Sequence, residues 1–463
     1  MAESLEELLQ QGLDAAERGN SAEAIVLLDR AVALNDQSPV AYFCRASVKG
    51  DFGEYAGSIV DFQRALDLNP NLPEAHRGIG VAYYKSQQFQ SAITQYSMAI
   101  AKNPNLAYVW GDRGLAQLEV DDYPAAIADL TEAIRLDGNN PLSYVNRGRS
   151  YHRLADFQKA IADFNQAILL DSRYGVAYYN RGLAYQSIGE PQSAFKDFES
   201  AILYQPNYAE AHLSLAQLHE QNQDLGAAFQ DYDAALRLKP DMPLAYLGRG
   251  RLYRNAGDLA AAMADFTAGI DLAPSAALHL QRGQAHAQQT DWAQAEIDFA
   301  SAIALDPESY DAHFQRGLAR SQAGKHAAAV ADFTAAIQLQ PQAVDAYYNR
   351  GLDHEMLGEY NAAIENYTQT ILMAGTFVPA WMNRGNCYLA LQRADVAIAD
   401  FEQVLRLAPS HPLGHANLGR AQATLGDRGQ AKQNLKLAAQ LAANQGQVGL
   451  QQQILGALKQ ITG

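Results

Sequence analysis

The chain has 463 residues, of which 48% are hydrophobic and 19% charged, and this balance excludes a wholly disordered protein. Its 35 Lys and Arg residues against 51 Asp and Glu residues give a net charge of −16, which argues against a nucleic-acid platform because so acidic a protein repels phosphate backbones. The only two cysteines, Cys44 and Cys387, are far apart, so the sequence contains neither a disulfide framework nor a CxxC metal or redox pair.

The N-terminal residues MAESLEELLQQG carry acidic side chains where a secretory signal needs a basic segment followed by an apolar one. No later stretch approaches the roughly 18 apolar residues of a membrane span. We therefore expect a cytoplasmic protein without a membrane-spanning segment.

Beyond this segment, one pattern recurs along the chain: a small residue, an alanine, an aromatic residue, another alanine, and then a proline. These prolines are Pro70, Pro104, Pro206, Pro240, Pro274, Pro307, Pro341 and Pro409. Their separations are 34 residues or multiples of 34, except for one separation of 33 after Pro274. A fixed period of this length is typical of a stacked repeat architecture.

In this pattern and period the chain resembles a tetratricopeptide repeat array. In the register of that family, 13 repeats cover residues 5–445 and begin at Leu5, Pro39, Pro73, Ala107, Pro141, Gly175, Ala209, Pro243, Ala277, Tyr310, Val344, Val378 and Pro412. The resemblance implies an all-α fold, an α-solenoid in which antiparallel helix hairpins stack into a right-handed superhelix. Stacking is needed because one hairpin alone cannot bury its apolar face.

Small residues define the expected seam between the two helices of a repeat. Glycine occupies the first of these positions in 11 of the 13 repeats, with Ala46 and Ala216 as the exceptions. Because glycine inside a helix costs about 1 kcal/mol relative to alanine, its recurrence predicts a close approach of the partner helix. We expect the small residue opposite to face it, as Ala194 would face Gly182, and large residues one turn later, such as Phe198, to fill the space between helices.

An arginine stands just before the small residue in nine repeats, where the family usually has leucine. In eight of the nine, an aspartate follows 16 residues later, and Arg350 has Asn366 instead. We predict that these arginines pair with aspartates of the same or the adjacent repeat and form a ladder through the stack. A structural ion pair is the leading interpretation, and a ligand-binding arginine row is the alternative.

By the same resemblance, the first helices line a concave groove. Position five of the repeat is mostly apolar and often aromatic: Phe43, Arg77, Gly111, Val145, Tyr179, Leu213, Leu247, Leu280, Phe314, Tyr348, Met382 and Ala416. Position six carries asparagine in two groups, Asn146 with Asn180, and Asn349 with Asn383 and Asn417. An asparagine offers a donor and an acceptor together, so such a row could bind the main chain of an extended peptide. The alternative is that the amides meet only water or a neighbouring turn.

Two basic spots interrupt the acidic sequence, Arg149 with His152 and Arg153 in the fifth repeat and Arg251 with Arg254 in the eighth. They could bind carboxylates of a partner, or they could be solvated or paired within the chain. The groove hypothesis therefore comprises the five asparagines, the aromatic residues Tyr179, Phe314 and Tyr348, and these four arginines.

The sequence contains no HExxH motif, Walker loop, GxSxG motif or Cys/His constellation, so we expect no enzyme, no cofactor and no metal site. Histidines at position four of the repeat, such as His212, are expected to be core substitutions. The leading function is a scaffold that binds partner proteins or extended peptides in the groove. A self-assembling structural protein, or an assembly factor or regulatory subunit of a larger complex, is the alternative.

The array has one irregular repeat and a distinct end. The ninth repeat is one residue short, so a changed hairpin angle there is one prediction and a trimmed turn without further effect is the other. In residues 446–463, Leu450, Ile454, Leu458 and Ile461 recur at the spacing of one helical stripe. They predict a C-terminal capping helix that covers the last repeat and exposes a polar face.

Overall fold

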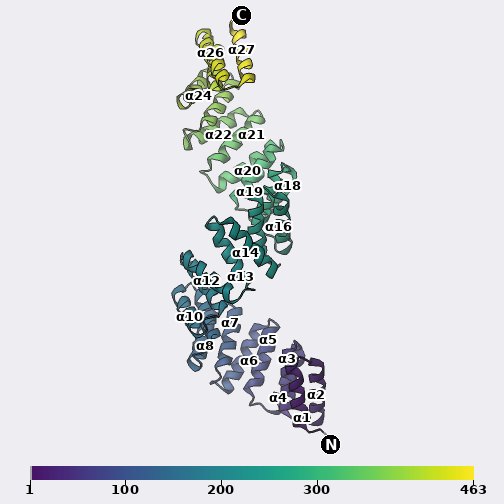
Figure 1. Cartoon of the computed structure of the whole chain (residues 1–463). Helices are drawn as coiled ribbons and strands as arrows, with labels where there is room; N and C mark the ends of the chain where they lie inside the picture. The colour runs from purple at the N-terminus through teal and green to yellow at the C-terminus, as the bar shows by residue number, and fades with distance from the viewer. Residues whose placement is uncertain (1–2, 463) are drawn as a thin grey trace. The chain divides into compact units, whose positions relative to one another are not determined.

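The computed structural model describes residues 3–462, which form 27 α-helices and, over that range, no strand. The chain divides into two compact units, Met1–Lys239 with α1 to α14 and Pro240–Gly463 with α15 to α27 (Figure 1). In each unit an odd-numbered helix and the following even-numbered helix form an antiparallel hairpin, and successive hairpins stack. The predicted all-α solenoid of helix hairpins is confirmed.

The helices have nearly constant lengths. In the first unit they are α1 Leu5–Glu17, α2 Ser21–Leu34, α3 Pro39–Asp51, α4 Tyr55–Leu68, α5 Pro73–Lys85, α6 Phe89–Lys102, α7 Ala107–Glu119, α8 Tyr123–Leu136, α9 Pro141–Arg153, α10 Phe157–Leu170, α11 Gly175–Ser187, α12 Pro191–Tyr204, α13 Ala209–Gln221 and α14 Leu225–Leu238. In the second unit they are α15 Pro243–Asn255, α16 Leu259–Leu272, α17 Ala276–Gln288, α18 Trp292–Leu305, α19 Tyr310–Gln322, α20 His326–Leu339, α21 Val344–Met356, α22 Tyr360–Met373, α23 Val378–Ala390, α24 Ala394–Leu407, α25 Pro412–Thr424, α26 Arg428–Asn444 and α27 Val448–Thr462.

The turn inside each hairpin contains one residue in the left-handed backbone region. Seven of these 13 residues are glycine, which adopts a positive φ without steric cost, as Gly189 does at φ 78°. The second helix then begins beside an N-cap side chain in many hairpins; the Asp224 carboxylate, for example, accepts a hydrogen bond from the Ala227 N–H. Such a cap satisfies one of the free N–H groups at the start of a helix.

At the seam between the two helices of a hairpin, the glycine lies closer to a large side chain than the pattern of small residues alone predicts. A Cβ atom added to Gly182 would lie 2.6 Å from the Phe198 ring, and the equivalent distance from Gly250 to Phe266 would be 2.5 Å. The closest neighbour of Gly182 is therefore the aromatic ring and not Ala194, the small residue that we expected to face it. Glycine recurs because it leaves room for a buried ring and not only for a neighbouring helix backbone.

The deletion in the ninth repeat falls in the linker between two hairpins. Helix α16 ends at Leu272 and α17 begins at Ala276, one residue earlier than the Ala277 of the repeat register. The Ser275 side chain caps α17 by accepting a hydrogen bond from the Leu278 N–H. The helices themselves keep their lengths, and the changed hairpin angle stays a prediction.

The chain ends with the unpaired helix α27. It packs against α26 through a cluster that includes Ile454, which is 4% exposed, and the partly buried Leu450, Leu458 and Ile461. These four residues are the stripe that the sequence predicts. Helix α26 has 17 residues where the other second helices have 14. The division into a repeat array of residues 5–445 and a C-terminal capping helix of residues 446–463 remains a prediction.

Cys387 is expected to be chemically inert in the folded protein. Its side chain on α23 is 1% exposed, and burial together with the neighbouring Glu355 carboxylate raises its pKa to about 12. Because a thiol in an unfolded chain ionises near pH 8.5, stability should fall as the pH rises from about 8.5 towards 12. Mass spectrometry after iodoacetamide treatment at mildly alkaline pH should show Cys387 unlabelled in the native protein and labelled in urea. Equal labelling rates in both states would contradict this prediction.

Candidate functional site

The arginine row forms a ladder of ion pairs inside the hairpins. In each of eight hairpins the guanidinium donates Nη2–H to an aspartate Oδ1 atom of its own second helix, over distances of 2.6 to 2.9 Å. The pairs are Arg45–Asp61, Arg113–Asp129, Arg147–Asp163, Arg181–Asp197, Arg249–Asp265, Arg282–Asp298, Arg316–Asp332 and Arg384–Asp400. Nε donates to the same carboxylate, which makes the contact bidentate. The predicted pairing within one repeat is confirmed.

The same guanidinium groups also connect neighbouring hairpins. Nη1 of Arg147 donates to Thr131 Oγ1 on the second helix of the preceding hairpin, at 3.1 Å. Arg350 and Arg384 make the equivalent bond to Thr334 and Thr368, both at 3.0 Å. An aromatic ring three residues before the arginine often covers the cation, as the Trp110 ring covers Arg113 at 4.9 Å. The ladder is thus occupied by contacts within the chain, which favours its structural interpretation over a ligand-binding row.

In three hairpins without the ladder arginine, a histidine contacts the second helix instead. Three hairpins carry Ile79, Leu215 or Leu418 at the arginine position, and each of these hairpins has a histidine three residues earlier. His76, His212 and His415 contact Gln95, Asp231 and Asn434 through Nδ1, at 3.0, 2.8 and 3.1 Å. The contacted residues are the ones 16 positions after the missing arginines. The expectation of simple core histidines is therefore incomplete, since these side chains are polar partners of the second helix.

Arg350 provides a natural test of the ladder because its partner is the neutral Asn366. Nε of Arg350 donates to Asn366 Oδ1 at 2.8 Å, and burial lowers the pKa of Arg350. We expect Asn366→Asp to raise the free energy of unfolding by about 1 kcal/mol at neutral pH, because hydrogen bonds to charged groups are stronger. The gain should disappear at strongly acidic pH, where the new carboxyl is protonated. Urea unfolding at both pH values measures this gain in stability. An unfolding midpoint of the variant at neutral pH that is equal to or lower than that of the unaltered protein would contradict the prediction.

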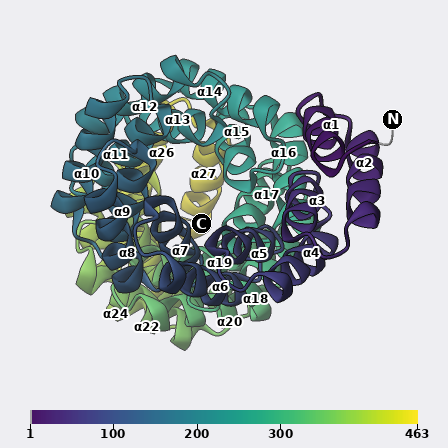
Figure 2. The ribbon, with the colours of Figure 1, turned by 90° about the horizontal axis from the view of Figure 1, so that it is seen from below.

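The first helices form one continuous surface in each unit, which we call the first-helix surface and define by repeat positions two, five, six, nine, twelve and thirteen. Figure 2 shows α9, α11 and α13 on the inside of the curve of the first unit, with α10, α12 and α14 outside them. In the second unit α15, α17, α19 and α21 also contact one another in succession. Large rings at position five pack onto the second helix, as Tyr348 does on Tyr367 with a centroid distance of 5.9 Å.

The five predicted asparagines are not equivalent. Asn146 and Asn417 are 3% and 8% exposed, so little of either side chain reaches the surface. The amide nitrogens of Asn180 and Asn349 donate to carbonyls of their own helices, at 2.7 and 2.8 Å. Within residues 3–462 the amide oxygens of these two side chains accept no hydrogen bond. Asn383 donates to the Tyr348 hydroxyl on the neighbouring hairpin at 3.2 Å.

The predicted aromatic residues are held in place by other rings. Tyr179 lies 4.7 Å from Tyr208 and 5.8 Å from Phe198, and burial raises the pKa of both tyrosines. Phe314 stacks on Tyr310 with 5.6 Å between the ring centroids. These half-buried rings therefore have fixed positions before any partner binds.

The predicted basic residues lie in different environments. Half-buried Arg149 donates to Asn146 Oδ1 at 3.3 Å, whereas Arg153 at the end of α9 is exposed. Arg254 donates to Gln284 on the neighbouring hairpin, and burial followed by repulsion from Arg251 lowers its pKa. Arg153 is therefore the most exposed of the four, whereas Arg149, Arg251 and Arg254 are half-buried.

Sequence reasoning missed Arg420, which occupies position nine of the last hairpin, as Arg149 and Arg251 do in theirs. The signal was available in that shared position.

No group of three or more His, Cys, Asp or Glu side chains suited to a metal ion occurs within residues 3–462. Over the same residues no helix is both long and apolar enough to cross a membrane.

Comparison with known proteins matches most of the repeated region to one family. Residues 112–174, 179–243, 230–277, 280–344, 314–371, 348–412 and 382–445 match a model described as tetratricopeptide repeat, and residues 51–87 match a second model described as TPR repeat. Among curated proteins, none matches the sequence.

Several solved structures are similar in fold. The APC/C hetero-tetramer Cut9–Hcn1 is 15% identical, and the match covers 91% of this chain and 97% of that one with a TM-score of 0.42. Yeast Tom70 is 16% identical, with 92% and 96% coverage and a TM-score of 0.34. A tetratricopeptide repeat protein from Parabacteroides merdae is 22% identical, with 53% and 98% coverage and a TM-score of 0.40.

Proposed function

Since the chain belongs to the tetratricopeptide repeat family, whose fold supports a scaffold for protein interactions, we propose that its first-helix surface binds an extended segment of a partner protein. The family is one of non-catalytic scaffolds, and we propose a binding role without catalysis for this chain as well. The cytoplasmic location stays a prediction.

The observation that carries the proposal is the state of the asparagine amides. In Asn180 and Asn349 the amide nitrogen is bonded to the helix itself, which fixes the side chain while its oxygen accepts no hydrogen bond from residues 3–462. A fixed acceptor on an inner surface suits the N–H of an extended main chain, whatever the side chains of that segment are. This mode is sequence-tolerant, so neighbouring side chains must supply selectivity.

Neighbouring rings and cations support two binding regions, one in each unit. In the first unit the ordered ring of Tyr179 adjoins Asn180, and Arg149 lies on the preceding first helix. In the second unit Asn383 and Tyr348 are linked by their hydrogen bond across two hairpins. Because these groups are already ordered by packing, binding would cost little conformational entropy on the side of the array.

A site-specific photo-crosslinker tests the proposal. We would introduce it in the full chain at Asn180 or Asn349 on first helices, and at Leu169 or Leu372 on second helices as matched controls. Both leucines are solvent-accessible, 75% and 73% exposed. In lysate of the source organism, the proposal expects a common crosslinked partner from the first-helix positions only.

Crosslinks from Leu169 or Leu372 alone would move the working surface to the second helices and overturn the proposal. A product containing only this chain would favour the self-assembling alternative, which light scattering at several concentrations would then measure. Recovery of a defined multiprotein complex would identify the chain as an assembly factor or regulatory subunit.

A further inference from the structure

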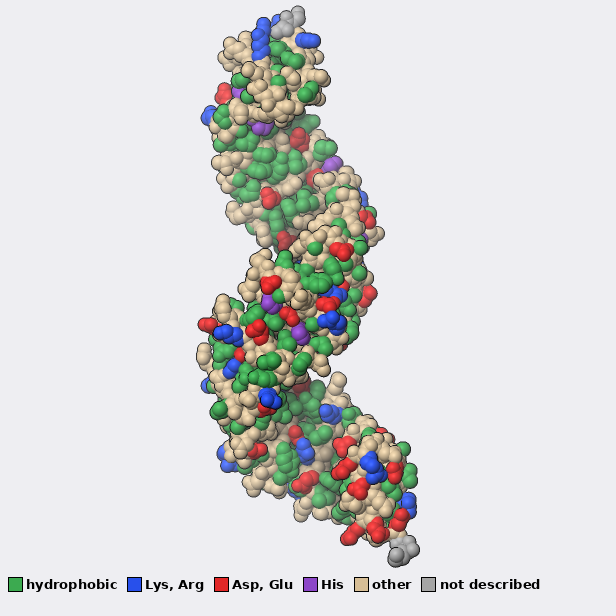
Figure 3. All heavy atoms as spheres, viewed as in Figure 1, with side chains coloured by type: hydrophobic (Ala, Val, Ile, Leu, Met, Phe, Trp, Pro, Cys, Tyr) green, Lys and Arg blue, Asp and Glu red, His purple; other side chains and the backbone are tan. Residues whose placement is uncertain are grey.

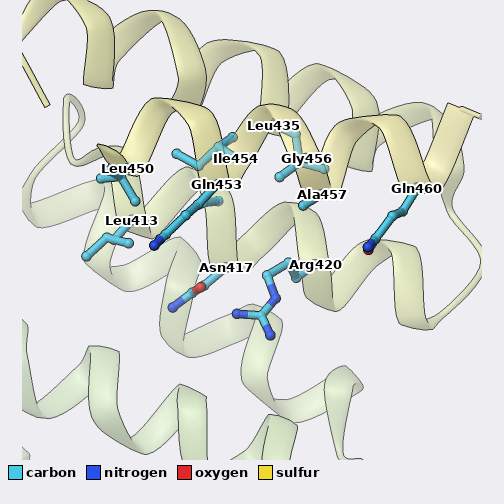
Figure 4. A pocket seen from close by; sticks show the side chains of 11 residues that line it. Leu413, Asn417, Arg420, Leu435, Leu450, Gln453, Ile454, Gly456, Ala457 and Gln460 are labelled. Atoms are coloured by element: carbon cyan, nitrogen blue, oxygen red, sulfur yellow. The ribbon is translucent and has the colours of Figure 1, made fainter. Parts of the chain in front are cut away.

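A hollow lies at the C-terminal end of the first-helix surface, between α25 and α27 (Figure 4). Its volume is about 420 Å³. The apolar lining includes Leu413, Ala416, Leu450 and Ile454, and the polar lining includes Arg420 and Gln453. Figure 4 shows Arg420 and Asn417 projecting from α25 on the side of the hollow opposite Leu450 and Gln453 of α27.

The hairpin beside the hollow has a small residue at position five. In four other hairpins this position carries a ring that packs onto the second helix, as Phe43 packs on Phe62 at 5.3 Å and Phe314 on Phe333 at 5.6 Å. In the last hairpin Ala416 occupies this position, and its counterpart on the second helix is the buried Leu435. Both residues line the hollow, so its floor is the place that an aromatic ring fills elsewhere in the array.

Small residues on α27 keep the space open. Gly456 and Ala457 line it, and a Cβ atom added to Gly456 would meet no atom within 4 Å. A regular hairpin in place of α27 could present a larger side chain here. An apolar recess of this size beside a polar rim is the usual form of a small binding site.

The cation beside this recess lacks a partner inside the protein. Within residues 3–462 the exposed guanidinium of Arg420 makes no hydrogen bond, ion pair or ring contact. The ladder arginines, in contrast, all have a carboxylate or amide oxygen as partner. Because an arginine fork matches a carboxylate in geometry and charge, Arg420 is equipped for an anionic group from outside the chain.

The surrounding charge favours the same kind of ligand. From Pro412 onward the sequence has five basic residues, Arg420, Arg428, Lys432, Lys436 and Lys459, against the single acidic Asp427. This end therefore has a net charge of +4 in a chain whose total is −16. Figure 3 shows basic side chains over α26 and α27, and acidic side chains over α1 and α2. An acidic segment would thus be attracted to the C-terminal end and repelled by most of the remaining surface.

We infer that this hollow binds an acidic segment of a partner protein, with an aromatic or aliphatic side chain in the apolar recess and an adjacent Asp or Glu carboxylate on Arg420. The inference rests on the proposed function and names the chemistry of one partner segment. A single arginine suits a single carboxylate, whereas a phosphate would call for a cluster of cations. Gln453 and Gln460 offer amide groups to the main chain of the segment.

Methyl NMR of the full chain tests the inference with defined peptides. The probes are four short peptides acetylated at the N-terminus and amidated at the C-terminus, with Phe-Glu, Phe-Gln, Phe-Lys or Ala-Glu between glycines. Titration of Phe-Glu should shift the methyl resonances of Leu413, Leu450 and Ile454. Phe-Gln and Ala-Glu should bind at least about tenfold more weakly, because each lacks one of the two contacts. Phe-Lys should not bind.

Two kinds of variant separate the contacts. Arg420→Gln should weaken Phe-Glu about tenfold and leave Phe-Gln unchanged, while Arg406→Gln, at an exposed arginine on α24, should change neither. Gly456→Leu fills the recess from α27 and Ala416→Phe restores the ring found in other hairpins. Either should abolish the methyl shifts. Gly456→Leu keeps the test valid if Ala416→Phe disturbs the packing around Leu435.

Equal binding of the Phe-Glu, Phe-Gln and Phe-Lys peptides, or unchanged binding by the filled variants, would overturn the inference. A peptide that ends in Phe with a free C-terminal carboxylate is a further probe. If it binds more tightly than Phe-Glu, the group that binds Arg420 is the C-terminus of the partner and not an Asp or Glu side chain, which would overturn that part of the inference. Self-association in light scattering that Arg420→Gln abolishes would assign the hollow to a second copy. Crosslinking at Asn180 or Asn349 is independent of these residues, so failure here leaves the broader proposal standing.

Discussion

Replacing Asp332 by alanine is expected to lower the free energy of unfolding by about 3 to 5 kcal/mol, the cost of removing one partner from a buried ion pair. Asp332 is 3% exposed, and its carboxylate accepts from Arg316 Nη2 at 2.6 Å and from Arg320 Nη1 at 2.9 Å. Its loss would leave two half-buried guanidinium groups without this carboxylate. Because repeat arrays need not unfold in one step, hydrogen exchange in α19 and α20 is the appropriate measurement.

Two further variants define what the Asp332 experiment measures. Asp332→Asn keeps an acceptor oxygen for Arg316, as Asn366 does for Arg350, and should cost less than the alanine variant. Asp271→Ala, at an exposed carboxylate near the end of α16, should change stability by less than about 0.5 kcal/mol. If the amide hydrogens of α19 and α20 exchange no faster in the Asp332→Ala variant than in the Asp271→Ala variant, the ion pairs of the ladder contribute nothing to stability.

Replacing Gly182 by alanine should destabilise the hairpin of α11 and α12 by about 1 to 3 kcal/mol, although alanine is the better helix former by about 1 kcal/mol. The reason is steric, since the added Cβ atom would lie 2.6 Å from the Phe198 ring. That ring is fully buried and cannot move without disturbing the neighbouring hairpin. Urea unfolding of the full chain, together with hydrogen exchange in the two helices, measures the effect.

Gly456→Ala is the matched control because this glycine is inside a helix and its added Cβ would meet no atom within 4 Å. There, alanine should stabilise by up to about 1 kcal/mol.

The second hairpin shows how the protein accommodates an alanine at the seam. Ala46 replaces the glycine, and the Phe62 ring lies against Gly78 of the next hairpin, where an added Cβ would be 2.4 Å away. Effects of opposite sign in the Gly182→Ala and Gly456→Ala variants would support the steric argument, whereas stabilisation by both would refute it.

The periodic part of the structure was predictable because each hairpin repeats the same local signals. The spacing of 34 residues, the seam glycines and the offset of 16 residues from arginine to aspartate each describe contacts within one hairpin or between neighbours, so they are visible in the sequence. The exact neighbour of Gly182 was not, because the size of Phe198 lets it reach the glycine from one turn beyond Ala194.

The candidate site was less predictable because exposure depends on neighbouring hairpins. The five asparagines share position six of the repeat, yet Asn146 and Asn417 are buried while Asn180 remains partly accessible. The hollow beside Arg420 depends on an absent side chain at Ala416 and on the placement of α27. A pattern of conserved spacing within one chain reveals what recurs, and these features are departures from it. The partner histidines are similar departures, and their contact with the second helix is not confined to hairpins without the arginine, since His279 contacts Asp298 beside Arg282.

The threefold contact of the ladder arginines has a mechanical consequence. Arg147 connects the two helices of its own hairpin and also binds Thr131 on the second helix of the preceding hairpin. A force that pulls the ends of the unit apart would therefore act on these hydrogen bonds. Ile79 and Leu215 stand at the arginine position and cannot donate this hydrogen bond to the preceding hairpin. Under tension the first unit should therefore part between α4 and α5, or between α12 and α13, and leave the intervening block of hairpins intact.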